Sequence, residues 1–238
     1  MNNTPIPWDK FDPMQYVKDN YVDLHDEDRI ILYLLSATYH QLPPLPLAVE
    51  VGVGPNLYPL MAMLPVVKKI EAIDYNPANL RYLKKQLKKP NKFWLAYWQL
   101  LHESCSSYQI DFLSELRRKV TLLEGDIYSL PENTYDLASM NFCAESVTDN
   151  RTMFELACQT YIRAVKSAGY FIASFMENST GYTVGTYHFP SCPIDKMTIM
   201  NIFIPVCDQW QMYHIPKAHQ PLRAGYSGML LFIGRKKK

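Results

Sequence analysis

The sequence has almost no net charge. Among its 238 residues, 24 Lys and Arg stand against 23 Asp and Glu, which gives a formal charge of +1 at pH 7. A protein that binds nucleic acid by neutralising phosphates needs an excess of basic residues. The charge balance therefore disfavours a nucleic-acid partner, and we expect the closing Lys236, Lys237 and Lys238 to form a solvated tail.

The sequence also lacks the run of about 18 apolar residues that a membrane-spanning helix requires. Its first residues, MNNTPIPWDKFDP, have neither the basic nor the apolar region of a secretory signal. The five cysteines are an odd number, lie far apart and include no C-x-x-C pair, so neither a zinc site nor a disulfide framework is expected. These absences predict a cytoplasmic protein with no metal and no membrane partner.

The residues that are present have the composition of a packed globular protein, 48% hydrophobic and 20% charged. The 17 tyrosines favour pockets lined by aromatic side chains. A chain of this length suits one α/β domain, and we expect a monomer or a homodimer.

Short apolar stretches alternate with amphipathic helical patterns along the chain. Such alternation predicts an α/β fold with a doubly wound, Rossmann-like sheet, mostly parallel with an antiparallel last strand. The expected strands are 47–51, 69–73, 119–123, 135–141, 169–175, 208–215 and 226–234, and the expected helices lie within 12–40, 56–66, 77–88, 92–117, 150–166 and 194–204. Residues 1–40 are expected to form a helical lid on the α/β domain at 41–238, the two making a single globular unit.

The first expected strand ends in the motif VEVGVGPN, from Val49 to Asn56. Its acidic Glu50 is followed by Gly52 and Gly54 in a turn from strand to helix, where the backbone can approach a ligand closely. Alone, a G-x-G turn is weak evidence, because many structural turns contain it.

Two further acidic residues strengthen that evidence. Asp74 ends the second strand about 20 residues later, where a carboxylate can accept hydrogen bonds from ribose hydroxyls. Asp126 follows the third strand. Ligands of open α/β sheets bind at the carboxyl ends of the strands, so we expect these side chains to share one site. The alternative is that Asp74 and Asp126 are only helix caps or turn residues.

A dinucleotide is the obvious competing ligand. The turn GVGPN lacks the third glycine of the dinucleotide fingerprint, and no P-loop lysine follows it. A ligand with ribose and adenine but no phosphate fits this turn better.

The segments VEVGVGPNLYPL, IDYNPANLRYLKKQL and EGDI resemble the three cofactor motifs of class I S-adenosylmethionine-dependent methyltransferases. The details are similar to the family of nicotinamide, phenylethanolamine and thioether methyltransferases. FDPMQYVKDNY resembles the lid motif of that family, and YTVGTYHFPSCPI and GYSGMLLFIGRK resemble its late segments on the acceptor side. The resemblance covers nearly the whole chain.

The resemblance implies a cofactor site for S-adenosyl-L-methionine, with S-adenosylhomocysteine as product. Tyr16 and Tyr21 would close over the methionine part, Glu50 and Gly52 would line its amino acid end, and Asp74 with Asn79 would bind the ribose. Asp126 and Ile127 would flank the adenine. The same motifs add these residues to the predicted cofactor site: Gly54, Asn56, Tyr75 and Asn141.

On the acceptor side the resemblance implies a carboxylate at Glu177, facing an amine, with Tyr182 beside it. The segment SMNFCAESVTDN departs from the family pattern and offers Asn141 and Glu145 instead, and the loop MENSTGYTVG is shorter. These four residues are the predicted catalytic set. Each also has a structural alternative: Tyr16 and Tyr21 as core aromatics, Glu145 and Glu177 as helix-cap or surface carboxylates.

The function expected is N-methylation of a small amine-bearing metabolite, in secondary metabolism. One alternative is an azetidine-2-carboxylate synthase, in which the cofactor's own amine attacks its γ-carbon and releases methylthioadenosine. Another is a non-catalytic module that binds S-adenosylmethionine and interacts with a partner, although intact Glu50, Asp74 and Asp126 argue against a dead site.

Overall fold

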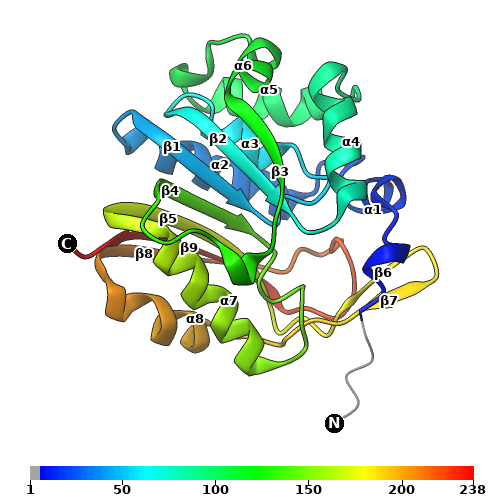
Figure 1. Ribbon diagram of the computed structural model, residues 1–238. Helices are drawn as coiled ribbons and strands as arrows, with labels where there is room; N and C mark the ends of the chain where they lie inside the picture. The colour runs from blue at the N-terminus through cyan, green and yellow to red at the C-terminus, as the bar shows by residue number, and fades with distance from the viewer. Residues whose placement is uncertain (1–5) are drawn as a thin grey trace.

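The structure, a computed structural model, describes residues 6–238; residues 1–5, the start of the predicted lid, lie outside the described part. Its centre is a seven-stranded sheet in the order β3-β2-β1-β4-β5-β9-β8 (Figure 1). The strands are β1 (Leu45–Val51), β2 (Val67–Asp74), β3 (Val120–Glu124), β4 (Tyr135–Asn141), β5 (Val165–Glu177), β8 (Cys207–Pro216) and β9 (Gly228–Lys236). The first five strands pair in parallel, and β9 runs antiparallel to both β5 and β8. The predicted fold class is confirmed.

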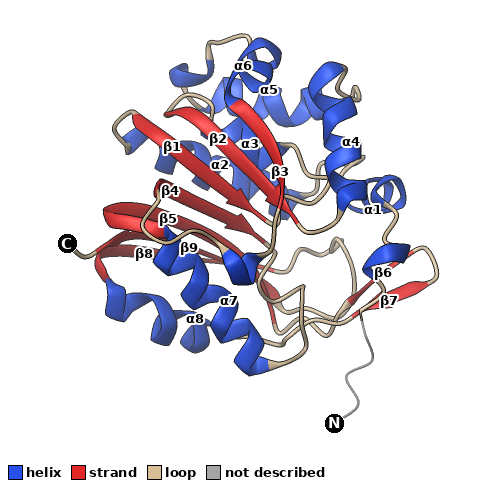
Figure 2. Ribbon diagram, viewed as in Figure 1, coloured by secondary structure: helices blue, strands red, loops and turns tan. Residues whose placement is uncertain are grey.

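Helices cover both faces of this sheet (Figure 2). They are α1 (Pro13–Asn20), α2 (Asp26–Gln41), α3 (Tyr58–Met63), α4 (Pro77–Lys88), α5 (Trp94–Ser104), α6 (Phe112–Lys119), α7 (Arg151–Ala164) and α8 (Lys196–Phe203). Residues of α2, α3, α5 and α6 contribute to one buried cluster, and residues of α7 and α8 to the other. None of these helices is both long and apolar enough to span a membrane, within residues 6–238.

Strand β1 is buried on both faces because it lies inside the doubly wound sheet. Ala48 belongs to one apolar cluster, whereas Val49 and Val51 belong to the other. The neighbours of β1 are β2 on one side and β4 on the other, so the strand order reverses at this point. A crevice at the carboxyl ends of such strands is the usual ligand site of open α/β sheets.

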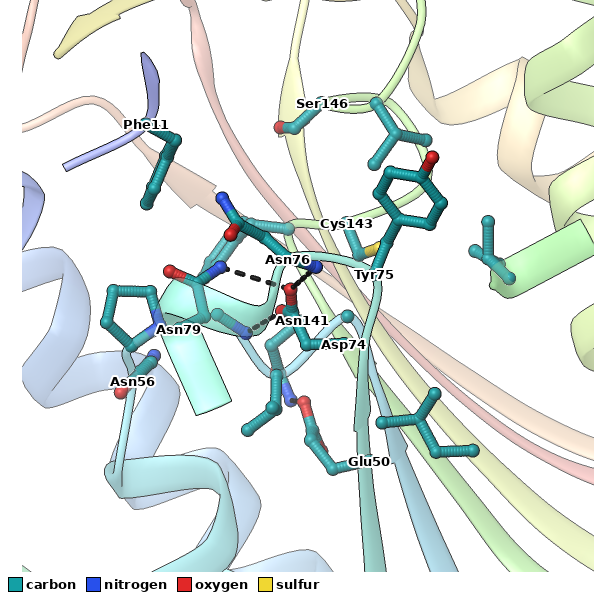
Figure 3. A pocket seen from close by; sticks show the side chains of 18 of the residues that line it. Phe11, Glu50, Asn56, Asp74, Tyr75, Asn76, Asn79, Asn141, Cys143 and Ser146 are labelled. Atoms are coloured by element: carbon teal, nitrogen blue, oxygen red, sulfur yellow. Dashed lines mark hydrogen bonds between the residues drawn. The ribbon is translucent and has the colours of Figure 1, made fainter. Parts of the chain in front are cut away.

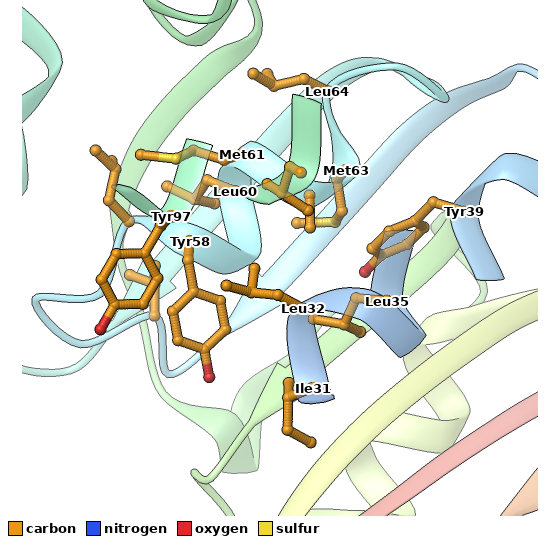
Figure 4. Packing of buried hydrophobic residues seen from close by; sticks show 14 of the residues in the cluster. Ile31, Leu32, Leu35, Tyr39, Tyr58, Leu60, Met61, Met63, Leu64 and Tyr97 are labelled. Carbon is orange, nitrogen blue, oxygen red and sulfur yellow. The ribbon is translucent and has the colours of Figure 1, made fainter. Parts of the chain in front are cut away.

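Helix α2 is a core helix of the first face. Its apolar residues Ile31, Leu32, Leu35 and Tyr39 are almost fully buried, and α3 is buried along its whole length (Figure 4). Burying side chains of this size stabilises the fold by roughly 1.5–3 kcal/mol each. Of the two helices in the predicted lid, α2 is therefore anchored to the sheet along most of its length.

The structure adds a hairpin that the sequence patterns did not predict. Strands β6 (Tyr182–Val184) and β7 (Tyr187–Phe189) pair in a segment expected to be a loop. Three-residue strands are too short for an alternating pattern to appear. The hairpin is held by Phe189, which is fully buried and packs against Trp8 and Phe11 at centroid distances of 5.3 and 5.4 Å.

Candidate active site

A cavity of about 310 Å³ lies at the carboxyl ends of β1, β2 and β4, in the size range of small-molecule sites (Figure 3). All the predicted cofactor residues line this cavity: Tyr16, Tyr21, Glu50, Gly52, Gly54, Asn56, Asp74, Tyr75, Asn79, Asp126, Ile127 and Asn141. Tyr182 of the predicted catalytic set lines it as well. Residues from six separate stretches of the chain therefore meet at one place.

The turn after β1 brings backbone close to the cavity. Gly52 and Gly54 have φ angles of 63° and 57°, a left-handed conformation that favours glycine. A Cβ atom on Gly52 would lie 2.1 Å from the Cys143 sulfur, whereas one on Gly54 would have nothing within 4 Å. Gly52 is therefore required by packing, and Gly54 leaves free space beside the backbone.

Asp74 ties this turn to the end of β2. One carboxylate oxygen accepts a hydrogen bond from the Gly54 amide at 2.7 Å, and the other accepts from the Asn76 amide at 2.7 Å and the Asn79 side chain at 3.1 Å (Figure 3). Burial raises the pKa of this carboxyl, and the three donors oppose that shift. A carboxylate has about four acceptor sites, so Asp74 keeps capacity for a ligand hydroxyl.

Asp126 lies two residues after the end of β3 and combines two roles. One carboxylate oxygen accepts a hydrogen bond from the Tyr128 amide at 2.9 Å and caps the short helix Ile127–Ser129. The residue lines the cavity together with Ile127. Serving as a cap and facing the cavity are thus compatible, because the cap uses only one oxygen.

Glu50 belongs to a buried hydrogen-bond network under the cavity. The Asn141 amide donates to Glu50 Oε1 at 3.0 Å, and Asn141 Oδ1 accepts from Ser174 at 2.8 Å. Glu50 Oε2 is buried and has no hydrogen-bond partner among the described residues, and Asn79 Oδ1 is in the same state. Buried polar atoms are rarely left unpaired, so these two acceptors fit a ligand that brings donors.

Aromatic residues form the outer wall of the cavity. Tyr16 packs edge-on against Tyr21 and Tyr182, at centroid distances of 5.9 and 6.0 Å. The Tyr21 hydroxyl accepts a hydrogen bond from the Asn56 side chain at 3.2 Å. Trp8 and Phe11, which are not among the predicted site residues, extend this wall.

Phe11 has a signal in the sequence, because it begins the segment FDPMQYVKDNY that resembles the lid motif of the family, whereas Trp8 lies outside that segment. Asn76 was also missed; its side chain donates to the Trp8 carbonyl at 3.0 Å and connects this segment to the end of β2. Asn76 also begins α4, because its side chain accepts from the Ala78 amide at 2.9 Å. An asparagine before Pro-Ala is an ordinary helix cap, which hides its second contact.

Glu177 is not brought together with the other predicted residues. It lines neither this cavity nor the smaller one beside it. Its carboxylate accepts from the Ser227 hydroxyl at 2.8 Å and lies 3.2 Å from His214 Nε2. Successive side chains of a strand point to opposite faces, and it is the preceding Met176 that lines the smaller cavity.

Glu145 is completely buried and lines neither cavity. Its Oε1 accepts from the Met176 amide at 2.8 Å, and burial raises the pKa of its carboxyl to about 7. The next residue, Ser146, lines both cavities instead.

Three buried carboxyl groups should make the folded protein less stable as pH rises. Burial raises the pKa of Asp28 to about 8 and the pKa values of Glu50 and Glu145 to about 7. The folded protein therefore binds these protons more tightly than the unfolded chain, and stability is lost as pH rises through the folded pKa values. We expect the free energy of unfolding to be lower at about pH 8 than at about pH 5.5, by a difference on the order of 2 to 5 kcal/mol.

Urea denaturation of the ligand-free protein at the two pH values measures this difference. Equal stability at both, or greater stability at the higher pH, would contradict the proposed protonation of these groups. Asp28→Asn should reduce the difference, since it removes one of the three protons.

A comparison with known families identifies the family of this chain. The model of the NNMT/PNMT/TEMT family matches residues 7–237, almost the whole chain. No curated protein sequence matches the chain.

Several solved structures share the fold at low sequence identity. The N-methyltransferase NodS from Bradyrhizobium japonicum, in complex with S-adenosyl-L-homocysteine, is 13% identical at a TM-score of 0.60, covering 96% of this chain and 94% of that one. An S-adenosylmethionine-dependent methyltransferase from Methanosarcina mazei is 11% identical at a TM-score of 0.60, and the match covers 84% of this chain and 97% of that one. Phosphoethanolamine N-methyltransferase 2 from Haemonchus contortus, in complex with S-adenosyl-L-methionine, is 11% identical at 0.57; the match covers 95% of this chain and 57% of that one.

The cofactor predicted for this fold agrees with the site. A nucleoside that has no phosphate and carries an amino acid brings several hydrogen-bond donors. The site offers acceptors for them in the unpaired oxygens of Glu50 and Asn79 and in the spare capacity of Asp74, and it has free space at Gly54. The cofactor is S-adenosylmethionine, and the chain belongs to the NNMT/PNMT/TEMT family of S-adenosylmethionine-dependent methyltransferases.

Proposed function

We propose that the protein transfers a methyl group from S-adenosylmethionine to the nitrogen of a small amine. The observation that carries the proposal is the cavity itself, in which acidic residues from three strand ends face a wall of tyrosines. Bound S-adenosylmethionine supplies an electrophilic methyl group on its sulfonium. The protein must align an acceptor with that group and exclude water, which can lower the barrier by about 7 kcal/mol or more.

We assign the residues by their position in the cavity. Asp74 and Asn79 would hold the ribose, and Glu50 the amino group of the methionine part. Asp126 and Ile127 would flank the adenine. In support, Glu50 and Asn79 each have an unpaired buried oxygen, and Asp126 has one carboxylate oxygen outside its cap.

The tyrosines would cover the sulfonium end. Tyr16, Tyr21 and Tyr182 lie where the larger cavity meets the smaller one, since all three line both. Aromatic faces attract cations, and a closed aromatic wall keeps water from the reacting atoms. The role of Glu177 at an acceptor amine stays a prediction, and so do a cytoplasmic location, the absence of a nucleic-acid partner and a monomeric or homodimeric state.

Product analysis tests the proposal. The protein is incubated with S-adenosylmethionine and a panel of small primary and secondary amines, and mass spectrometry follows S-adenosylhomocysteine and the methylated amine. We expect S-adenosylhomocysteine to form only when an acceptor is present. Formation of no S-adenosylhomocysteine with any amine would contradict N-methylation.

One observation favours a second candidate, the azetidine-2-carboxylate synthase. The smaller cavity beside the larger one has a volume of only about 20 Å³, which limits the space for a separate acceptor. In that reaction the amine of S-adenosylmethionine forms a bond to its own γ-carbon while the carbon–sulfur bond breaks. Release of methylthioadenosine from S-adenosylmethionine alone, with no amine added, distinguishes this reaction from methyl transfer.

A further inference from the structure

The smaller cavity, which we call the side chamber, lies between α1, the first turn of α2 and the segment before β9. Its walls include Tyr16, Tyr21 and Tyr182, which it shares with the larger cavity, and Asp28 and Arg223, which it does not. A volume of about 20 Å³ has room for one or two groups the size of a water molecule. The side chamber can therefore hold only one or two heavy atoms, which are either a whole molecule of that size or the end of a larger one.

Asp28 is a buried carboxyl group in the wall of the side chamber. The residue is 2% exposed, and its Oδ2 is buried without a hydrogen-bond partner among the described residues. The preceding Glu27 differs, because its Oε1 accepts hydrogen bonds from the Tyr226 hydroxyl and, at 3.1 Å, from the Ala218 amide. Glu27 Oε2 is also buried without a partner among residues 6–238, but Glu27 does not line the side chamber; it fixes the segment before β9, whereas Asp28 lines the chamber.

The charged and titratable groups around Asp28 do not neutralise it. Arg223 donates to the Gly181 carbonyl at 3.1 Å and to the Ser179 hydroxyl at 3.2 Å, and its guanidinium lies 5.1 Å from the centre of the Tyr182 ring. No ion pair joins it to Asp28 in the described part of the chain. Burial and the negative charge of Glu27 raise the pKa of Asp28, while the Tyr58 hydroxyl lowers it.

An unpaired carboxylate in so small a space selects for a compact donor. A primary or secondary ammonium group carries positive charge and N–H donors, and it is small enough for the side chamber. An apolar or anionic group would leave Asp28 without a partner, at a cost of about 1–3 kcal/mol or more.

We propose that Asp28 binds the amino nitrogen of the acceptor in the side chamber as a primary or secondary ammonium and takes one of its protons. This inference rests on the proposed N-methylation. The N–H bond breaks and the proton passes to the Asp28 carboxylate, which leaves a lone pair on the nitrogen. That lone pair forms the bond to the methyl carbon while the carbon–sulfur bond breaks, with S-adenosylhomocysteine as the leaving group.

The binding test uses methylammonium chloride as the probe and needs no turnover. The protein is saturated with S-adenosylhomocysteine at a pH above 8, where the Asp28 carboxyl is ionised, and its melting temperature is measured. At about ten times its dissociation constant, methylammonium should raise the melting temperature by about 3 °C relative to the same concentration of sodium chloride. Tetramethylammonium, which is too large for the side chamber and has no N–H donor, should give no such increase.

Two variants make the binding test specific. Asp28→Asn should abolish the increase, and Asp26→Asn should keep it, because Asp26 lies in the same helical turn with a side chain that is 84% exposed. An equal increase in wild type and Asp28→Asn, or no increase in wild type, would overturn the assignment.

A kinetic test applies to whichever amine is methylated. Asp28→Asn should lower kcat/KM for that amine by about 10- to 100-fold and leave the affinity for S-adenosylhomocysteine unchanged. Equal kcat/KM values for Asp28→Asn and wild type would refute the role of Asp28 alone. Failure of every amine to react would refute the proposed function, and the methylammonium test would still decide whether Asp28 binds an ammonium.

Discussion

Replacing Gly52 with alanine is expected to lower the free energy of unfolding by about 2 to 5 kcal/mol. Two costs combine at this position. The φ angle of 63° disfavours any residue with a Cβ, by roughly 1–2 kcal/mol. The new methyl group would also lie 2.1 Å from the Cys143 sulfur and 2.8 Å from its Cβ, which forces the two segments apart. Urea denaturation measures the loss.

Gly54 is the matched control for this prediction. Its φ angle of 57° carries the same backbone cost, but an added Cβ meets nothing within 4 Å. Gly54→Ala should therefore cost only about 1–2 kcal/mol. The double variant Gly52→Ala, Cys143→Gly should recover part of the loss, because it removes both contacting atoms. If Gly52→Ala and Gly54→Ala proved equally destabilising, the clash with Cys143 would be disproved.

Asp74→Ala is expected to weaken the binding of S-adenosylhomocysteine by roughly 100-fold or more. A hydrogen bond to a charged group contributes about 1.5–3 kcal/mol, and the carboxylate would bind ribose hydroxyls while also fixing the Gly54 and Asn76 amides that shape the cavity. Alanine removes both effects together. Calorimetric titration measures the affinity, with circular dichroism to verify that each variant is folded.

Glu124 offers a control at the neighbouring strand end. It pairs in register with Asp74, but it is exposed and does not line the cavity. Glu124→Gln should leave the affinity unchanged. Asp74→Asn should give an intermediate loss, since its single amide oxygen can replace only part of the carboxylate. Unchanged affinity in Asp74→Ala would remove Asp74 from the cofactor site.

The cofactor side of the cavity could be predicted because its residues follow a local rule. Glu50, Asp74 and Asp126 each lie in or directly after an apolar stretch that has the length of a buried strand. Parallel strands bring their carboxyl ends to one edge, so the positions of these residues along the chain imply their proximity in space. The structure places all three on the same cavity.

The acceptor side follows no such rule. Glu177 ends a strand just as Asp74 does, yet it turns towards His214 and Ser227 and away from both cavities. Asp28 lies in the run DEDR, which has the composition of a solvent-exposed helix start, and the structure buries it. Burial of a charged side chain depends on which distant segments cover it, here the segment before β9 that Glu27 holds.

The order of apolar and charged residues was sufficient to specify the doubly wound sheet, its cofactor motifs and the three acidic strand ends, because these depend on spacing within short stretches. Packing between remote segments determined the rest: the hairpin held by Phe189, the contact that requires glycine at position 52, and the unpaired carboxylate of Asp28. Such contacts join residues up to 199 positions apart, as between Glu27 and Tyr226. A pattern within one stretch carries no information about a partner at that distance.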